Sequence, residues 1–380
     1  MSWLFNEQHR IFRKSVRRFV DEALNPNVDE WEQNGAFPKS TFKTMGELGF
    51  LGIRFPTAYG GSDADMATTT VFCEELGRCR SRGVTMGVLV QTDMSSPYLA
   101  HFGNENQKQT YLPGIVRGDT VCSIALTEPD HGSDLAHMST TAKRQGTTYL
   151  INGSKVFITN ALNADLFFVT AKTAPQAGHR GISVFLVERD APGLTVESMG
   201  KKLGMHASDT GHLTFNDCEV SAANLLGEEN RGFYYIMERL SVERYVSMAA
   251  LVSSAQQALD DAVAYAQSRE MFDSRLSRFQ VTRHKLAQLQ TKIEAARRLV
   301  HHTCWLYDQG RQPDKEVAMC KAFCADVGCE VADVCLQLHG GNGYMEEYDI
   351  ARFYRDARLW KIGAGSTETM YEIIAKQMRI

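Results

Sequence analysis

Hydrophobic positions change their period twice along the chain. From Asn6 to about Gly118, apolar residues recur at helical spacing in segments such as "NEQHRIFRKSVRRFVDEAL", and turn signals such as "AYGGSD" and "FGNEN" separate the segments. Between about Val121 and Glu228 the chain consists of short runs of β-formers, broken by Gly, Asn, Asp and Pro. From Gly232 onward the helical period returns in long segments with broad apolar stripes.

This order predicts an α+β protein with several domains. We expect a helical N-terminal domain over residues 1–120, a middle domain with an antiparallel sheet over residues 121–229 and a C-terminal four-helix bundle over residues 230–380. No low-complexity linker separates them, so the three regions should pack as one unit. The pattern excludes a doubly wound nucleotide-binding fold, in which strands and helices alternate.

The net charge of -4 argues against a protein that binds nucleic acid mainly by neutralising phosphates. The local basic run "RIFRKSVRRFV" is interspersed with Phe12, Val16, Phe19 and Val20 at helical spacing. We therefore expect it to be the solvated face of an amphipathic helix rather than a polybasic arm or a transit peptide.

The nine cysteines are scattered and never spaced C-x-x-C, which predicts buried thiols in a reducing compartment. Cys320 and Cys324 lie four residues apart, but no set of His or acidic residues accompanies them, so we expect no metal site. No signal peptide or long apolar run is evident. We expect a cytoplasmic protein without a membrane partner, or a mitochondrial matrix protein if the chain is a processed eukaryotic one.

Six motifs then follow one another in a fixed order. They are "ALTEPDHGSDL" from Ala125, "NGSKVFITN" from Asn152, "LLGEENRGFYYIM" from Leu225, "SREMF…RFQ" from Ser268, "QLHGGNGYMEEY" from Gln337 and "RFYRDAR" from Arg352. With these motifs the chain resembles, over nearly its whole length, the acyl-CoA dehydrogenases, flavoproteins that oxidise an acyl thioester to its 2,3-enoyl form. The resemblance is greatest to the long-chain and isovaleryl types.

The resemblance implies FAD in the groove between the β-domain and the bundle. By resemblance, Thr127 and Ser133 offer donors to the flavin and its pyrophosphate, and Arg269 lies with the adenosine and pyrophosphate contacts, supplied together with residues of a neighbouring subunit. The residues that match the family's FAD contacts are Ala125, Leu126, Thr127, Gly132, Ser133, Phe157, Ile158, Thr159, Arg269, Phe272, Gln280, Gln337, Gly340, Gly341, Gly365, Ser366 and Glu368.

Four positions depart from the family's pattern. Phe157 stands where relatives usually place Trp beside the flavin ring, and it can equally be a core aromatic of a strand. Asp273 replaces a usual Gly, which puts the local turn in question, and Glu368 replaces a frequent Gln. His131 replaces a small residue, and we expect it to be partly exposed on its loop.

The base that removes the Cα proton is the main question about the chemistry. Such a base is best supplied by a carboxylate in a dry pocket, with a pKa raised toward neutrality. Many relatives place a glutamate where this chain has Ala364, but the long-chain and isovaleryl types place it in an E-R-apolar motif that matches "SVERY". The resemblance therefore implies Glu243 as the base, with Glu238 as the fallback and a surface ion-pair residue as the alternative for Glu243.

Further matches concern the substrate. The resemblance implies that the backbone N–H of Ala364 donates to the thioester oxygen, and the small side chain there favours a branched, cyclic or bulky acyl group. Arg244 matches a contact to the CoA end, and Ser133 also counts as a substrate contact. Asp93 falls on a helix that lines the acyl pocket in the family, and we expect it to face solvent unless the substrate is polar there.

The resemblance thus implies an FAD-dependent acyl-CoA dehydrogenase. Glu243 takes the Cα proton, flavin N5 takes the Cβ hydride, and an electron-transfer flavoprotein receives the electrons. The family forms homo-oligomers, here expected to be a homotetramer of two dimers. The alternatives are a dehydrogenase of acyl or aminoacyl groups on a carrier protein, an acyl-CoA oxidase and, more remotely, a non-catalytic or DNA-associated member. The sequence does not define the acyl chain or the electron acceptor.

Overall fold

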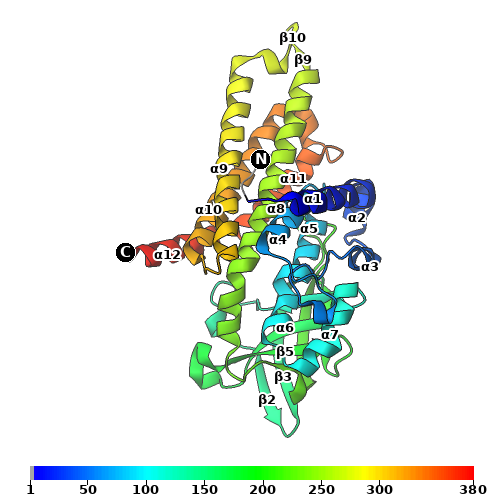
Figure 1. The fold of residues 1–380 in the computed structure, drawn as a ribbon, viewed down its shortest axis with the longest axis vertical. Helices are drawn as coiled ribbons and strands as arrows, with labels where there is room; N and C mark the ends of the chain where they lie inside the picture. Colours follow the sequence, from blue (N-terminus) through cyan, green and yellow to red (C-terminus); the bar gives the residue numbers. More distant parts are fainter. Residues whose placement is uncertain (1–3) are drawn as a thin grey trace.

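Residues 4–380 are described by a computed structural model, and they follow the predicted order of helices, sheet and helices (Figure 1). The N-terminal part is helical and packs beside the middle of the long C-terminal helices. Its helices are α1 (Glu7–Phe19), α2 (Val28–Asn34), α3 (Ser40–Glu47), α4 (Met66–Leu76), α5 (Arg82–Leu89), α6 (Ser96–Phe102) and α7 (Glu105–Arg117). A π-helical segment, Val90–Ser95, joins α5 to α6.

Helix α1 contains the basic run, which confirms that this run is one face of an amphipathic helix. Val16 is fully buried in the core. The arginines beside this buried face are not simply solvated, however, because Arg13 and Arg17 both pair with the buried carboxylate of Glu75 on α4. The basic face therefore docks α1 onto α4.

The middle part is one eight-stranded sheet with the order β6-β7-β3-β2-β4-β5-β8, and β1 pairs with β4. Most pairings are antiparallel, as predicted, but β1–β4 and the single β2–β4 contact are parallel, so the sheet is mixed. The long crossover from β1 to β4 includes the β2–β3 hairpin and gives the chain room to return in the same direction. The strands are β1 (Cys122–Ala125), β2 (Thr141–Gln145), β3 (Thr148–Thr159), β4 (Leu166–Lys172), β5 (Ile182–Glu188), β6 (Leu194–Ser198), β7 (Thr210–Ser221) and β8 (Leu225–Leu226).

The C-terminal helical domain that the sequence predicts is confirmed, and α8 (Gly232–Ser268) is its axis. Figure 1 shows α8 running from the sheet to the hairpin of β9 (Glu270–Met271) and β10 (Ser274–Arg275) at the far end of the molecule. The other helices are α9 (Gln280–Asp308), α10 (Asp314–His339), α11 (Asp349–Ala357) and α12 (Thr367–Met378). Helix α12 rests on α10 through Met370 and projects from the body at the left of the view.

Two hydrophobic cores hold the regions together around α8. One contains Phe72 of α4, Leu251 of α8 and Cys324 of α10, so it joins the N-terminal helices to the bundle. Another contains Leu99 of α6, Phe168 of β4 and Ile236 of α8, so it joins the sheet to the start of the same helix. Because α8 takes part in both cores, side chains on its first half lie where all three regions meet.

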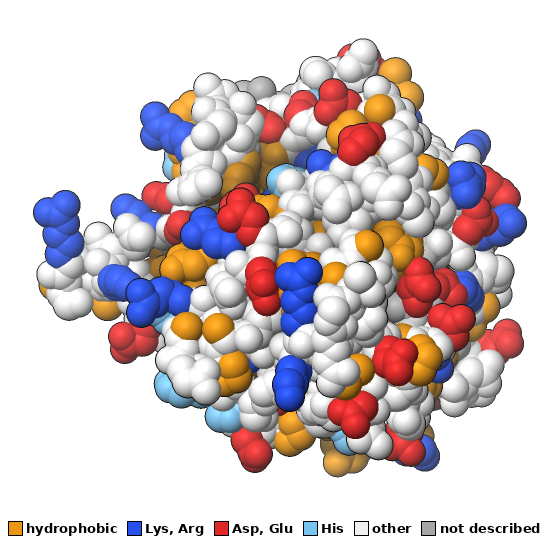
Figure 2. Space-filling view, turned by 90° about the horizontal axis from the view of Figure 1, so that it is seen from below, with side chains coloured by type: hydrophobic (Ala, Val, Ile, Leu, Met, Phe, Trp, Pro, Cys, Tyr) orange, Lys and Arg blue, Asp and Glu red, His pale blue; other side chains and the backbone are white. Residues whose placement is uncertain are grey.

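The prediction of buried, unpaired thiols is confirmed, since all nine thiols are free and all but the half-buried Cys329 are buried. Within residues 4–380, no helix is long and apolar enough to cross a bilayer. Acidic and basic side chains both occur across the face seen from below in Figure 2, in keeping with the small net charge.

Candidate active site

Glu243 is buried on α8, and its surroundings make it a weak acid. The residue is 5% exposed, and its Oε1 accepts a hydrogen bond from the Tyr98 hydroxyl on α6 at 3.1 Å. Burial raises the pKa of Glu243 to about 7, although the Tyr98 hydrogen bond and the Arg244 and Arg239 cations oppose the rise. A carboxyl group with this pKa can accept a proton near neutral pH.

Neither of the alternatives for Glu243 agrees with the structure. A surface ion-pair residue would be exposed, whereas Glu243 is buried and forms no ion pair within 4 Å among the described residues. The fallback, Glu238, is on the exposed side of α8. Of the two candidate bases, Glu243 is therefore the one that is shielded from solvent.

The loop at Ala364 is held by two cations. Arg244 Nε donates to the carbonyl oxygen of Ala364 at 2.8 Å, and Lys321 Nζ donates to the carbonyl oxygen of Gly365. Ala364 has a φ of 55°, a left-handed conformation that is uncommon for a residue with a side chain. The two cations fix the carbonyls and therefore the direction of the backbone N–H groups between α11 and α12.

Lys321 was not among the predicted site residues. Its side chain is fully buried on α10, and burial together with the Arg244 cation lowers the pKa of its ammonium to about 8. A lysine inside the nearly continuous apolar stripe of residues 314–339 is the signal that could have identified it. Tyr98 was also not predicted, because no sequence pattern indicates that it contacts Glu243 on α8.

The loop after β1 is anchored from beneath by a buried ion pair. Glu128 Oε1 accepts from Lys155 Nζ of β3 at 2.9 Å, and the Glu128 carboxylate also accepts from the backbone N–H groups of Ser139 and Thr140. The Lys155 cation and these hydrogen bonds outweigh burial and lower the pKa of Glu128 to about 2. The anchor leaves Gly132 and Ser133 exposed at the top of the loop, and His131 is half-buried there.

Phe157 stands out from β3 because the strand bulges at this point. The β3–β7 register shifts between Lys155 and Ile158, and Phe157 has a φ of 60°. As a result the Phe157 ring is 67% exposed while Ile158 is buried, so Phe157 is not a core aromatic of the strand. The loop and this ring are adjacent, because the N–H of Val156 donates to the carbonyl of Thr127 at 2.9 Å.

Six of the predicted cofactor residues are not brought to Glu243 within one chain. Arg269, Phe272 and Gln280 are exposed around the β9–β10 hairpin, which is separated from Glu243 by 26 residues of helix, about 39 Å. Gln337, Gly340 and Gly341 are exposed at the end of α10. The hairpin forms despite Asp273, since Phe272 and Asp273 both take the positive φ that a two-residue loop requires.

The expectation that Asp93 faces solvent is wrong. Asp93 lies in the π-helical segment, is 4% exposed and pairs with Arg54 at 3.1 Å. Thr92 also donates to it at 2.7 Å. The cost of burying the carboxylate is offset by a partner that is 39 residues away in sequence and therefore invisible to the local pattern.

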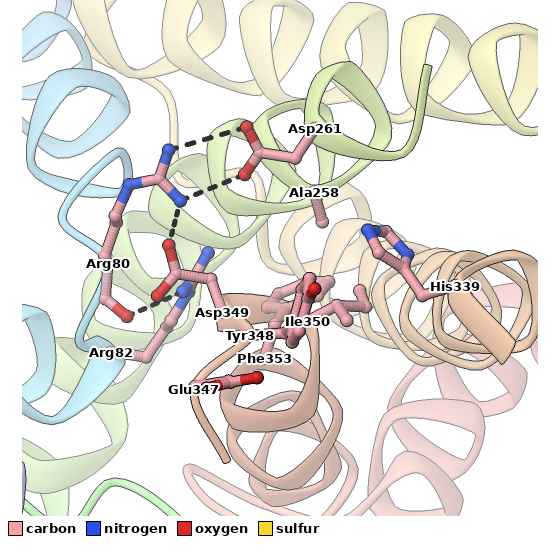
Figure 3. Close-up of a pocket in the computed structure, with 10 residues that line it drawn as sticks. All are labelled: Arg80, Arg82, Ala258, Asp261, His339, Glu347, Tyr348, Asp349, Ile350 and Phe353. Atoms are coloured by element: carbon pink, nitrogen blue, oxygen red, sulfur yellow. Dashed lines mark hydrogen bonds and ion pairs between the residues drawn. The ribbon is translucent and has the colours of Figure 1, made fainter. Parts of the chain in front are cut away.

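A cavity of about 260 Å³ lies elsewhere, between α8, α10 and α11 (Figure 3). Arg80 bridges Asp261 and Asp349 at its edge, and His339 lines it from the end of α10. Its lining includes none of the residues that surround Glu243. The cavity is therefore separate from the Glu243 site.

Three family models match consecutive parts of the chain. They describe the N-terminal domain of acyl-CoA dehydrogenase at residues 6–119, the middle domain at residues 123–218 and the C-terminal domain at residues 230–379. The chain belongs to the acyl-CoA dehydrogenase family, and the predicted family and fold are confirmed. It is a flavin-dependent oxidoreductase of that family.

Individual members of the family are similar to this chain over nearly its whole length. The chain is 39% identical to a probable acyl-CoA dehydrogenase of Bacillus subtilis, YngJ, over 100% of both chains. It is 38% identical to the mitochondrial long-chain specific acyl-CoA dehydrogenase of Rattus norvegicus, over 99% of this chain and 87% of that protein. The crystal structure of an acyl-CoA dehydrogenase from Geobacillus kaustophilus is 42% identical, with a TM-score of 0.98 over 100% of both chains.

Proposed function

We propose that this enzyme is an FAD-dependent acyl-CoA dehydrogenase that forms 2,3-enoyl thioesters with Glu243 as its base. The observation that carries the proposal is a buried carboxyl group with a pKa of about 7, on the helix where all three regions meet and next to Arg244, which holds the Ala364 loop. In this reaction Glu243 accepts the Cα proton. Tyr98 keeps the carboxylate aimed by donating to Oε1.

The Ala364 loop fits the second task, which is to stabilise the enolate that develops on the thioester oxygen. Arg244 and Lys321 hold the loop carbonyls in place, and the backbone N–H of Ala364 makes no hydrogen bond to another described residue, so it can donate to the substrate. Arg244 also brings positive charge to the same place, in line with its predicted contact to the CoA end.

The chain has a surface that fits FAD, which when bound supplies the hydride acceptor. The exposed Phe157 ring offers an apolar face to the flavin. At Gly132 an added Cβ would meet no atom within 4 Å, so the loop has room for close approach. Thr127 and Ser133 on the same loop would hold the cofactor by hydroxyl and backbone donors, with Ile158 and Thr159 beside them. The buried Ala125 could contribute only through its backbone.

The position of Arg269 at the β9–β10 hairpin favours assembly into a homo-oligomer, which we propose to be a homotetramer. The separation of about 39 Å between Arg269 and Glu243 along α8 exceeds the length of one extended dinucleotide, so the two would serve different cofactors. A second copy would bring its own Arg269, Phe272 and Gln280 to the site. The electrons would then pass to an electron-transfer flavoprotein.

The test is anaerobic titration of the purified holoenzyme with straight, branched and cyclic acyl-CoAs, followed by the visible flavin spectrum. We expect wild type to bleach and Glu243→Gln not to, while the exposed matched control Glu238→Gln behaves as wild type. Equal reduction of Glu243→Gln and wild type would rule out Glu243 as the base.

The same experiment separates the related activities. Reduction by a carrier-protein thioester and by no CoA ester would support the carrier-protein alternative. Peroxide formation during aerobic turnover would identify an oxidase. No reduction by any thioester, with DNA binding that is lost at high salt, would support the non-catalytic alternative.

A further inference from the structure

Arg239 is a buried cation that has no carboxylate partner within residues 4–380. It lies one turn before Glu243 on α8 and is 5% exposed. Its Nη1 contacts His101 Nε2 at 3.2 Å, but Nε and Nη2 are shielded from solvent and have no hydrogen-bond partner among the described residues. Burying a guanidinium in this way is costly unless an anion compensates it.

His101 does not supply that anion. Its Nδ1 faces the carbonyl of Pro97 at 2.9 Å and so carries the ring proton, which leaves Nε2 to accept from Arg239. Loss of hydration and the Arg239 charge lower the pKa of His101 to about 4. The ring is therefore neutral at physiological pH. Glu243 and Asp93 act on the Arg239 charge from a distance, but Arg239 forms no ion pair among the described residues.

The nearby acids are engaged elsewhere. Asp93 is paired with Arg54, and the Glu243 carboxyl is bonded to Tyr98. The Tyr307 hydroxyl on α9 is a further buried group without a partner, and the Arg239 cation is close enough to act on its pKa. Two nitrogen atoms of Arg239, Nε and Nη2, and the Tyr307 hydroxyl thus have no hydrogen-bond partner among the described residues.

We infer that Arg239 and Tyr307 form an anion subsite of the acyl pocket and that the substrate's acyl group carries a carboxylate. This inference rests on the proposed function, because it takes Glu243 to mark the position of the reacting carbons. An arginine fork can hold both oxygens of a carboxylate, and the Tyr307 hydroxyl can add a third hydrogen bond.

The spacing on α8 limits the length of the acyl group. Glu243 and Arg239 are neighbours at i and i-4, with Cβ atoms about 6 Å apart. A carboxylate held by Arg239 would therefore lie a few bonds beyond the carbons that react at Glu243. The class of substrate is a short dicarboxylic acyl thioester.

The test compares thioesters of equal carbon number in anaerobic reduction of the holoenzyme. The pairs are glutaryl-CoA with pentanoyl-CoA and adipoyl-CoA with hexanoyl-CoA. We expect a half-saturation concentration about 10- to 100-fold lower for the carboxylated member of at least one pair, the range of a charge-assisted hydrogen bond.

Variants test whether Arg239 and Tyr307 cause the preference for the carboxylated thioester. Arg239→Met removes the charge with little change in volume and should abolish the preference within each pair. Because the Arg239 cation also lowers the pKa of Glu243, the two members of a pair are compared in the same variant at the same pH. Tyr307→Phe should reduce the preference, and Arg239→Lys should retain part of it. Arg298→Met, which removes an exposed arginine of α9, is the control and should keep the wild-type preference.

Specific outcomes overturn the inference. If wild type prefers the alkanoyl member of both pairs, the subsite does not bind a carboxylate. If Arg239→Met weakens both members equally, Arg239 serves the CoA end or Glu243 instead. The wild-type comparison decides even if Arg239→Met fails to fold. If no thioester of either kind reduces the flavin, the proposed function itself fails, which is a different result.

Discussion

At the scale of single residues, the site consists of ionisable groups that are kept dry. Burial raises the pKa of Glu243 to about 7 and lowers the pKa of Lys321 to about 8. In each case burial disfavours the charged form. The chemistry therefore depends on which side chains cover these groups and not on the residues' intrinsic acidity.

The pH dependence of flavin reduction should report on Glu243. The base acts in its ionised form, so the rate at subsaturating substrate should rise as pH increases through about 7 and level off above it. Tyr98→Phe removes a hydrogen bond that favours the carboxylate, so it should move the midpoint to higher pH. Stopped-flow reduction across pH 5.5–9 measures both curves. A midpoint that stays near the ordinary glutamate value would contradict the dry environment.

Lys321 should act as a positioning residue for the Ala364 loop. Lys321→Met frees the Gly365 carbonyl and should lower the limiting rate of flavin reduction about 10- to 100-fold, with a smaller change in half-saturation. Lys315→Met, an exposed lysine of the same helix, is the matched control. If Lys321→Met changed only the thermal stability and not the limiting rate, the lysine would be merely structural.

At the scale of elements, the cofactor-facing surface depends on how loops are anchored to strands. The bulge in β3 turns Phe157 outward, and the Glu128–Lys155 pair supports the loop that contains Gly132. Neither the bulge nor the ion pair can be predicted from the sequence pattern, because an alternating strand pattern indicates neither a register shift nor a partner on another strand.

Breaking the Glu128–Lys155 pair should destabilise the protein. Lys155→Met leaves a buried carboxylate without its cation and should lower the free energy of unfolding by about 3–5 kcal/mol. Because the folded pKa of Glu128 is lowered to about 2, its stabilising contribution is present above about pH 4.5 and is lost as pH falls toward 2. Urea unfolding of wild type and variant at several pH values measures this. An unchanged midpoint at pH 7 would show that the pair is dispensable.

At the scale of the whole molecule, α8 separates two sets of residues that the proposed function needs together. Glu243 lies on the first half of α8, where the three regions meet, and Arg269 directly follows α8. Figure 1 shows the hairpin of β9 and β10 beside Arg269 at the far end of the molecule. Within one chain they cannot serve the same cofactor, so assembly should complete the site.

Mixed oligomers can test this directly. Arg269→Ala should weaken FAD retention, and Glu243→Gln should block proton removal, so each variant alone should be inactive. Coexpressed chains that assemble together should recover part of the activity, since one intact Glu243 can meet an intact Arg269 of another copy. Recovery in separately purified and unmixed oligomers would point to a different cause, and no recovery in verified mixed oligomers would contradict a shared site.

The sequence by itself determined the order of helices and strands, the family and the presence of a glutamate in the "SVERY" motif. These follow from local periodicity and from short motifs, which a chain carries along its length. Only the tertiary structure decided that Asp93 is buried with Arg54, that Lys321 holds the Ala364 loop and that Arg239 is buried without an ion pair among the described residues. Burial and pairing arise between residues far apart in sequence, so the protonation and partners of charged groups are set by packing rather than by pattern.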